Sequence, residues 1–162
     1  MCIDVEAKTT AYCELSSSKV KYCTILSLSS MSVRHVDYEG VLEIHKEIIR
    51  KMGGKFVVIN YGNLRYCLGS VLDKGHNVLL IERCIEKAAF YIWCICLAHA
   101  FLDCNKRTAF QVAYVFLVAN GFELRGSDTE EIVSMMINIS TRQITIDSVR
   151  NWIRKHIKSV VT

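Results

Sequence analysis

Five side chains that can take part in phosphate chemistry fall within nine consecutive positions of this chain. They are His99, Asp103, Asn105, Lys106 and Arg107. An imidazole can accept a proton near neutral pH, and a carboxylate is a hard oxygen ligand that suits Mg2+. The carboxamide and the two cations can donate hydrogen bonds to phosphate oxygens. The segment therefore has the groups needed for phosphoryl or nucleotidyl transfer.

Two long apolar runs flank this segment, Ala88–Ala98 before it and Phe110–Ala119 after it. Each run predicts a helix that is buried on nearly all sides. The segment between them is then a tight link, with Asp103 or Asn105 as the N-cap of the second helix. A helix start carries unpaired amide donors and a partial positive charge, so this link predicts a phosphate-binding site.

The order His-x-Phe-x-Asp-x-Asn-Lys-Arg-Thr-Ala, from His99 to Ala109, resembles the signature of the Fic/Doc family. Within that family it is most similar to the death-on-curing (Doc) branch of toxin–antitoxin toxins. The similarity continues through Tyr114–Glu123, and more weakly from about His35 to the C-terminus. The resemblance implies an all-α fold, a single-domain helical bundle of about six helices with room for a small β flap. Residues 33–162 would form this domain, and residues 1–32 an added segment of uncertain order.

Periodicity and capping residues predict the other elements. A first helix is expected from the N-cap Asp37 to Met52, ended by Gly53-Gly54. His45 lies near its apolar stripe and is interpreted as a structural histidine. Further helices are expected over 64–72, 78–99 with Asn77 as its cap, and 127–139, and a last one opens at Thr145 or Asp147. Residues 55–60 resemble a strand, either a flap that would pair with a target's backbone or an apolar connector.

The resemblance assigns a role to each residue of the motif. His99, Asp103 and Arg107 would be catalytic, with His99 as general base and Asp103 as the Mg2+ ligand. Asn105, Lys106 and Arg107 would bind the nucleotide together with Cys104, which stands where the family usually has a smaller residue. Phe101 would face the core and pin the loop. The implied cofactors are ATP and Mg2+.

Lys106 separates two activities within the family. Members that transfer AMP generally have Asp-Gly-Asn-Gly-Arg, where the second glycine leaves room for the nucleotide's phosphates. A lysine at that position resembles the Doc branch, in which ATP binds so that its γ-phosphate reaches a Ser or Thr hydroxyl of a protein. We therefore expect a protein kinase. An AMP-transferase and an inactive Fic-fold binding module remain the alternatives.

Partners are also implied by the resemblance. The protein target would be elongation factor Tu, with arrested translation as the result, and an antitoxin protein would silence the enzyme. Inhibitory helices of the family resemble Ser/Thr-x-x-x-Glu-Gly/Asn. The nearest match here, His35–Gly40, has a histidine in place of the hydroxyl residue. Self-inhibition is therefore not expected.

Composition limits the other function classes. The chain has 162 residues, 51% of them hydrophobic, and a net charge of +4 without a basic and aromatic stripe, which argues against direct nucleic-acid binding. The N-terminus lacks a signal-peptide pattern, and the longest apolar run, Ala88–Leu102, is too short for a membrane span, so we expect a soluble cytoplasmic protein.

The eight cysteines are accordingly expected to stay reduced. A zinc site is not expected, because Cys94 and Cys96 would point about 200° apart on a helix.

Overall fold

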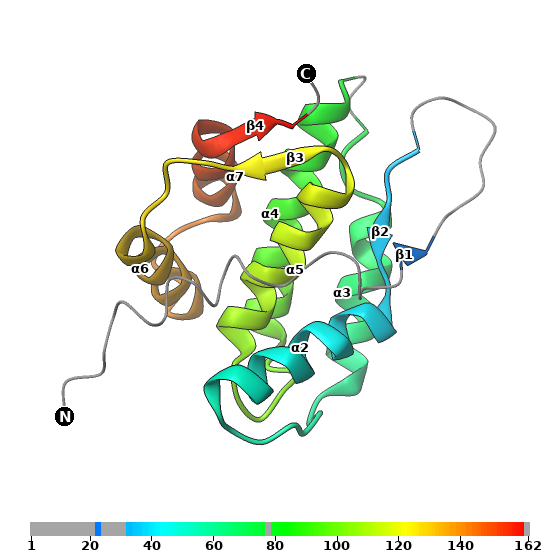
Figure 1. Cartoon of the computed structure of the whole chain (residues 1–162), viewed down its shortest axis with the longest axis vertical. Coiled ribbons are helices and arrows are strands. Elements are labelled where there is room, and N and C mark those ends of the chain that lie inside the picture. Colours follow the sequence, from blue (N-terminus) through cyan, green and yellow to red (C-terminus); the bar gives the residue numbers. More distant parts are fainter. Residues whose placement is uncertain (1–21, 24–31, 77–78, 161–162) are drawn as a thin grey trace.

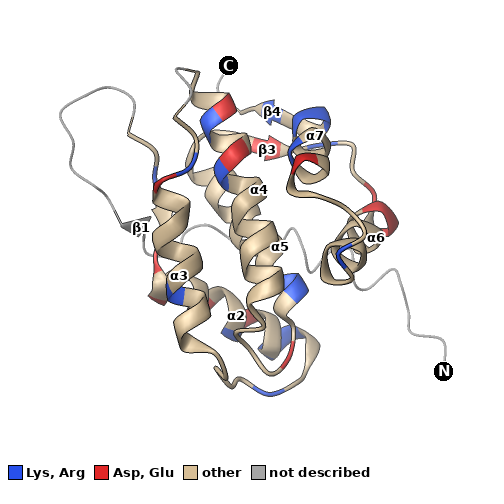
Figure 2. Cartoon of the chain, turned by 180° about the vertical axis from the view of Figure 1, so that it is seen from behind, with Lys and Arg blue, Asp and Glu red and all other residues tan. Residues whose placement is uncertain are grey.

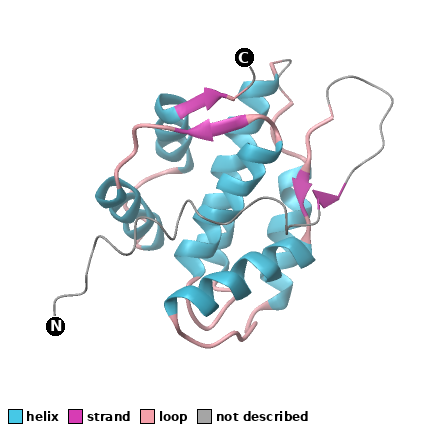
Figure 3. Cartoon of the chain, viewed as in Figure 1, coloured by secondary structure: helices cyan, strands magenta, loops and turns pink. Residues whose placement is uncertain are grey.

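The computed structural model describes residues 22–23, 32–76 and 79–160. These residues form six helices and four short strands (Figure 1). The helices are α2 (Tyr38–Met52), α3 (Tyr61–Leu72), α4 (Leu80–Ala98), α5 (Asn105–Ala119), α6 (Thr129–Ser140) and α7 (Ile146–His156). The strands are β1 (Tyr22–Cys23), β2 (His35–Val36), β3 (Phe122–Leu124) and β4 (Ile157–Ser159). The predicted all-α class and the six helices are confirmed for the part of the chain described (Figure 3). Most of the predicted segment 1–32, and the predicted cap Asn77, lie outside the described residues.

The antiparallel pair α4 and α5 forms the centre of the bundle (Figure 1). Helices α2 and α3 pack on one side of this pair, and α6 and α7 on the other. The apolar runs that predicted α4 and α5 supply the largest buried side chains of both helices, including Tyr91, Ile95 and Phe116. None of the described helices combines the length and apolar character needed to cross a membrane.

Side-chain caps fix several helix ends close to the predicted positions. Asp37 caps α2 by accepting a hydrogen bond from the Gly40 amide at 2.8 Å, and Gly53 ends that helix with a φ of 76°. Asp128 caps α6 and Thr145 caps α7. These residues place their side-chain oxygens on amides that would otherwise lack a partner.

Two short antiparallel strand pairs lie at the margins of the bundle. In the first, β1 pairs with β2. In the second, β3 pairs with β4 in the register Glu123 opposite Lys158, which joins the end of α5 to the last described segment.

Residues 55–60, for which a strand-like flap and an apolar connector were both left open, form no continuous strand. They form a single bridge, Val58 to Phe101, and their backbone also bonds to the segment between α4 and α5. The Leu102 amide donates to the Val57 carbonyl at 3.0 Å, and the Ile59 amide donates to the Ala100 carbonyl at 2.8 Å. The partner is a short loop rather than a strand, so the pairing cannot propagate. Residues 57–60 thus hold the motif loop in place from one side.

Helix α3 begins at Tyr61, three residues earlier than predicted, because Asn60 acts as its N-cap. Its first turn is anchored to α4 by Asn63, whose amide Nδ2 donates to the Ala98 carbonyl at 3.0 Å. Ala98 is the last residue of α4, directly before His99.

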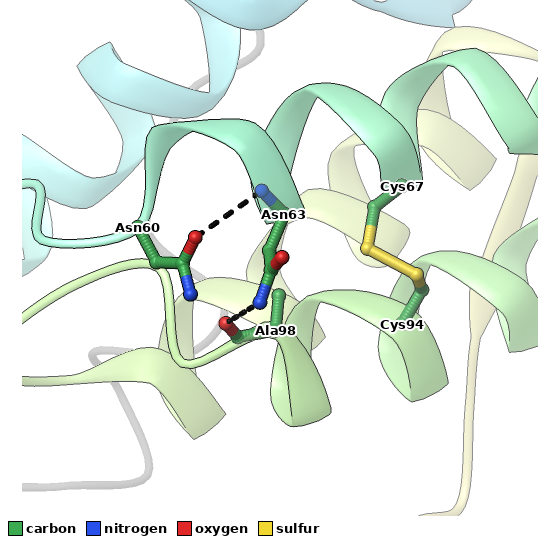
Figure 4. The surroundings of a disulfide bond; sticks show 5 residues. All are labelled: Asn60, Asn63, Cys67, Cys94 and Ala98. Atoms are coloured by element: carbon green, nitrogen blue, oxygen red, sulfur yellow. Dashed lines mark hydrogen bonds between the residues drawn. A yellow bond between two sulfur atoms is a disulfide. The ribbon is translucent and has the colours of Figure 1, made fainter.

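A disulfide between Cys67 of α3 and Cys94 of α4 corrects the expectation that all cysteines stay reduced (Figure 4). The two cysteines are 27 residues apart and belong to no Cys-x-x-Cys pattern. They meet only because α3 packs along α4, which is tertiary information. At the far end of α3, the buried Lys87 of α4 donates to the Val71 and Leu72 carbonyls. The disulfide therefore adds a covalent bond between these helices to the hydrogen bonds made by Asn63 and Lys87.

This disulfide predicts a stability that depends on reductant. Closing a loop with a separation of 27 residues is expected to contribute about 3–4 kcal/mol, or a shift of about 10 °C in Tm for a domain of this size. Dithiothreitol should therefore lower the Tm measured by calorimetry, while the links from Lys87 and Asn63 keep the domain folded. A Cys67→Ser/Cys94→Ser double variant is the control and should melt at one temperature with or without reductant. Equal melting of the wild-type protein in both buffers would contradict the bond.

Candidate active site

All six residues predicted for the site line one cavity of about 700 Å3. The cavity lies at the end of the bundle where α4 ends, α5 begins and α2 reaches its C-terminus. Its lining includes residues of α6, the end of α2 with the two glycines that follow it, and the six motif residues: Met52, Gly53, Gly54, His99, Asp103, Cys104, Asn105, Lys106 and Arg107. The structure thus brings the whole motif to one hollow surface.

The loop from His99 to Cys104 is closed by Asn105 and Phe101. The Asn105 side chain accepts from the Phe101 amide at 2.9 Å and donates to the Phe101 carbonyl at 2.6 Å. Phe101 is buried, as predicted, and anchors the loop in the core. Asn105 was predicted to donate to a phosphate, yet these two bonds use its oxygen and one of its two N–H groups. Its main structural role is to shape the loop.

Two residues of this loop adopt left-handed backbone conformations without being glycine. His99 has a φ of 45° at the C-cap of α4, and Cys104 has a φ of 60° at the N-cap of α5. Such conformations cost free energy in non-glycine residues and persist where the surroundings impose them. They turn the chain sharply twice, so that the exposed His99 and the start of α5 face the same cavity.

The predicted N-cap of α5 is wrong. The cap residue is Cys104, which makes no side-chain capping bond. Asn105 is occupied with Phe101, and Asp103 accepts a hydrogen bond from the Lys55 amide at 3.1 Å through Oδ2. The first amides of α5 therefore have no capping side chain, and they remain available to an anion in the cavity.

The half-buried Asp103 is held from the side of α2. Gly54 has a φ of 115°, and a Cβ built on it would lie 3.4 Å from Asp103 Oδ2 and 3.2 Å from Ile49 Cδ1. A side chain at Gly54 would be strained by its backbone conformation and would crowd the carboxylate. The described residues contain no group of three or more His, Cys, Asp or Glu side chains that could hold a metal ion. A cation bound at Asp103 would therefore depend on one protein carboxylate together with phosphate and water, a set typical of Mg2+.

Cations lie on the first turn of α5. Lys106 is exposed and Arg107 is half-buried. The Nη1 atom of Arg107 lies 3.6 Å from Cys104 Sγ. In Figure 2 this end of α5 is blue and the loop that leads into it carries a red segment. The negative charge of Asp103 therefore lies in the loop before α5, and the positive charges of Lys106 and Arg107 lie on the helix itself.

One wall of the cavity, which α6 provides, was not expected from the sequence. Val133 is 40% exposed and Ile137 is 48% exposed, and both line the cavity beside the buried Met136. The two exposed residues are one helical turn apart and lie outside the stripe that faces the core. This second apolar stripe is the feature of the sequence that could have identified α6 as a wall of the cavity. It gives the cavity one apolar side, suited to a ring or an apolar side chain.

His45 of α2 also lies at this site, beneath the loop. Its ring is fully buried and stacks on Phe101, with 3.8 Å between the ring centroids. Burial lowers the pKa of His45 to about 4, and the nearby carboxylate of Asp103 opposes that shift only in part. The ring is therefore neutral at pH 7, in agreement with the interpretation of His45 as a structural rather than a catalytic histidine.

Comparison with known proteins agrees with this geometry. The family model described as Fic/DOC family matches residues 35–117. The chain is 27% identical over 123 residues to "Protein kinase doc" of Escherichia phage P1, covering 76% of this chain and 95% of that protein. It is 32% identical over 98 residues to "Toxin Doc" of Mycolicibacterium smegmatis, covering 60% of this chain and 75% of that protein. The matched region contains the whole cavity motif from His99 to Arg107, and the chain therefore belongs to the Fic/DOC family, within its Doc branch.

Proposed function

We propose that this protein is a Doc-type kinase, a toxin that transfers the γ-phosphate of ATP to a Ser or Thr hydroxyl of a protein. The observation that carries the proposal is that His99, Asp103, Lys106 and Arg107 share one cavity with the uncapped start of α5. This arrangement supplies a base, a metal ligand and fixed positive charge on one surface. The kinship with a phage protein named a kinase supports the same class of reaction.

The start of α5 suits the polyphosphate of a nucleotide. Its first amides lack a capping side chain, and the Lys106 and Arg107 side chains add two full charges beside them. The apolar residues of α6 line the same cavity and offer a surface for the nucleotide's base. Mg2+, when bound, would neutralise charge on the phosphates, and Asp103 is the carboxylate placed to hold it.

The reaction assigns one step to each side chain. His99 accepts the proton of the target hydroxyl as its oxygen bonds to the γ-phosphorus. The bond from that phosphorus to the bridging oxygen breaks, and ADP leaves. Arg107 and the amides of α5 stabilise the charge that develops on the phosphate oxygens. Lys106 fills the part of the cradle where AMP-transferring relatives have glycine, and so favours a nucleotide seated with its γ-phosphate toward His99.

We further propose elongation factor Tu as the target and a separate antitoxin as the regulator. The part of α2 that borders the cavity is its C-terminal end. In the segment that most resembles an inhibitory helix, His35 lies in β2 and Glu39 lies in the first turn of α2, at the other end of that helix. Neither of these two residues lines the cavity. Silencing by a second protein is consistent with this placement, and arrested translation would be the consequence of the unopposed enzyme.

The mass of the product tests the kind of group transferred. Purified elongation factor Tu should gain about 80 Da after incubation with the protein and Mg-ATP, because phosphoryl rather than adenylyl transfer is expected. Lys106→Gly should lower this transfer. An adduct of about 329 Da from the wild-type protein would instead identify an AMP-transferase. No adduct on this target or on any protein of a bacterial lysate would identify an inactive binding module.

Replacement of His99 tests the general base. His99→Ala should slow transfer by about 10²–10⁴-fold, the usual contribution of a positioned base, and should still bind Mg-ATP. The side chain is exposed, so the variant should melt close to the wild-type temperature. Transfer at the wild-type rate would remove His99 from the mechanism.

Replacement of Asp103 tests the metal ligand. Asp103→Asn keeps the size of the side chain and can still accept from the Lys55 amide, but it loses the charge that Mg2+ requires. Transfer should collapse at low Mg2+ and recover in part as Mg2+ is raised, which a titration of rate against Mg2+ would measure. A normal rate at low Mg2+ would show that Asp103 only ties the loop to Lys55.

A further inference from the structure

His45 makes contacts on both sides of the motif loop. Its ring stacks on Phe101 at 3.8 Å with an interplanar angle of 18°, and its Nδ1 lies 2.9 Å from Thr108 Oγ1. Phe101 precedes Asp103 in the loop, and Thr108 lies on the first turn of α5. One buried side chain from α2 therefore touches a residue before Asp103 and a residue after Arg107.

The direction of the hydrogen bonds follows from proton counting. The Thr108 hydroxyl donates its one proton to the Cys104 carbonyl, with an oxygen–oxygen distance of 2.9 Å. With its proton on that carbonyl, the hydroxyl accepts from His45, and this arrangement assigns the His45 proton to Nδ1. The result is a directed chain from the His45 N–H through the Thr108 hydroxyl to the Cys104 carbonyl.

The other ring nitrogen argues against a purely structural role for His45. Nε2 is buried and has no hydrogen-bond partner within the described part of the chain. An unpaired buried polar atom costs about 1–3 kcal/mol. A phenylalanine ring could stack on Phe101 without that cost, but it is larger than an imidazole and would have to fit a fully buried site. The unpaired Nε2 is therefore a cost that packing on Phe101 alone does not explain.

This chain of hydrogen bonds ends at Cys104, the residue with left-handed backbone at the end of the loop. Cys104 has a φ of 60°, caps α5 without a side-chain bond, and lies between Asp103 and the first turn of α5. Asn105 fixes the other end of the loop at Phe101. If the Cys104 carbonyl turned, the Asp103 carboxylate and the first amides of α5 would both change direction.

We propose that His45 is a positioning residue that, through Thr108, holds Cys104 in its left-handed conformation and so aims Asp103 and the start of α5 into the cavity. The expected effect on the reaction rests on the proposed function. The expected effect on the loop does not, because it follows from the contacts alone.

Kinetics of matched variants test the proposal. His45→Phe keeps a ring over Phe101 but removes the donor, and because its larger ring must fit a fully buried site, a modest fall in Tm is expected and is measured first to establish that the variant is folded. Its kcat should fall by about 10–100-fold, as is typical when a supporting hydrogen bond behind a site is lost, while its KM for ATP changes little. His45→Asn keeps a donor near the position of Nδ1 and should recover part of kcat despite weaker packing.

Thr108 variants and a second buried histidine supply the controls. Thr108→Val should match His45→Phe, and the double variant should be no slower than either single one, because both break one chain of bonds. Thr108→Ser keeps the hydroxyl and should stay near wild type. His35→Phe replaces a buried histidine bonded to Tyr91 that does not line the cavity, and it should leave kcat unchanged.

Two measurements on the loop do not need activity. Nitrogen-15 NMR of the wild-type protein should show His45 as the neutral tautomer protonated at Nδ1. Iodoacetamide labelling of Cys104, followed by peptide mass spectrometry, should be several-fold faster in His45→Phe than in the wild type, because the loop is released.

The outcomes separate the two proposals. A His45→Phe variant with wild-type kcat and wild-type labelling, or a ring protonated at Nε2, would overturn the positioning role and leave the kinase proposal intact. If the wild-type protein transfers no phosphoryl group, the positioning role of His45 is decided by the His45 tautomer and the Cys104 labelling rate alone. Faster labelling with the Nδ1 tautomer would then support the positioning role although the proposed function had failed.

Discussion

The double hydrogen bond between the Asn105 amide and the Phe101 backbone is the interaction on which the site depends. It closes a loop of a few residues between two antiparallel helices, and the burial of Phe101 ties that loop to the core. Such a short connection must reverse the chain quickly, and it does so through left-handed conformations at His99 and Cys104. Because α4 and α5 are also the centre of the bundle, the geometry of the cavity is set by the same packing that sets the fold.

Much of this could be predicted from sequence because it is written in local patterns. The apolar runs gave α4 and α5, the capping residues Asp37 and Thr145 gave helix starts, and the ordered motif gave the residues that line the cavity. Each of these signals lies within one element or one short segment. The expected roles of the motif residues rested on the family resemblance. The structure adds that these residues line one cavity.

The parts that could not be predicted depend on contacts between distant segments. The Cys67–Cys94 bond, the Asn63 bond to the end of α4, and the pairing of residues 57–60 with the motif loop all join elements that are separate in sequence. The N-cap of α5 was mispredicted for the same reason. Asp103 has a suitable side chain for a cap, but the Lys55 amide, which follows α2, competes for it. Propensity describes what a side chain can do, and tertiary neighbours decide which partner it takes.

A contrast among the helix starts links the fold to the proposed chemistry. α2, α3, α6 and α7 each begin with a side chain that accepts from an early amide, whereas α4 and α5 do not. Of these two, only α5 opens into the cavity, with Lys106 and Arg107 on its first turn. The site thus combines uncapped amides, positive charge and left-handed backbone at one end of a bundle in which four of the six described helices have a side-chain cap. A bound polyphosphate would supply the missing acceptors, so the groups that cost stability in the free protein are the ones that would bind the nucleotide.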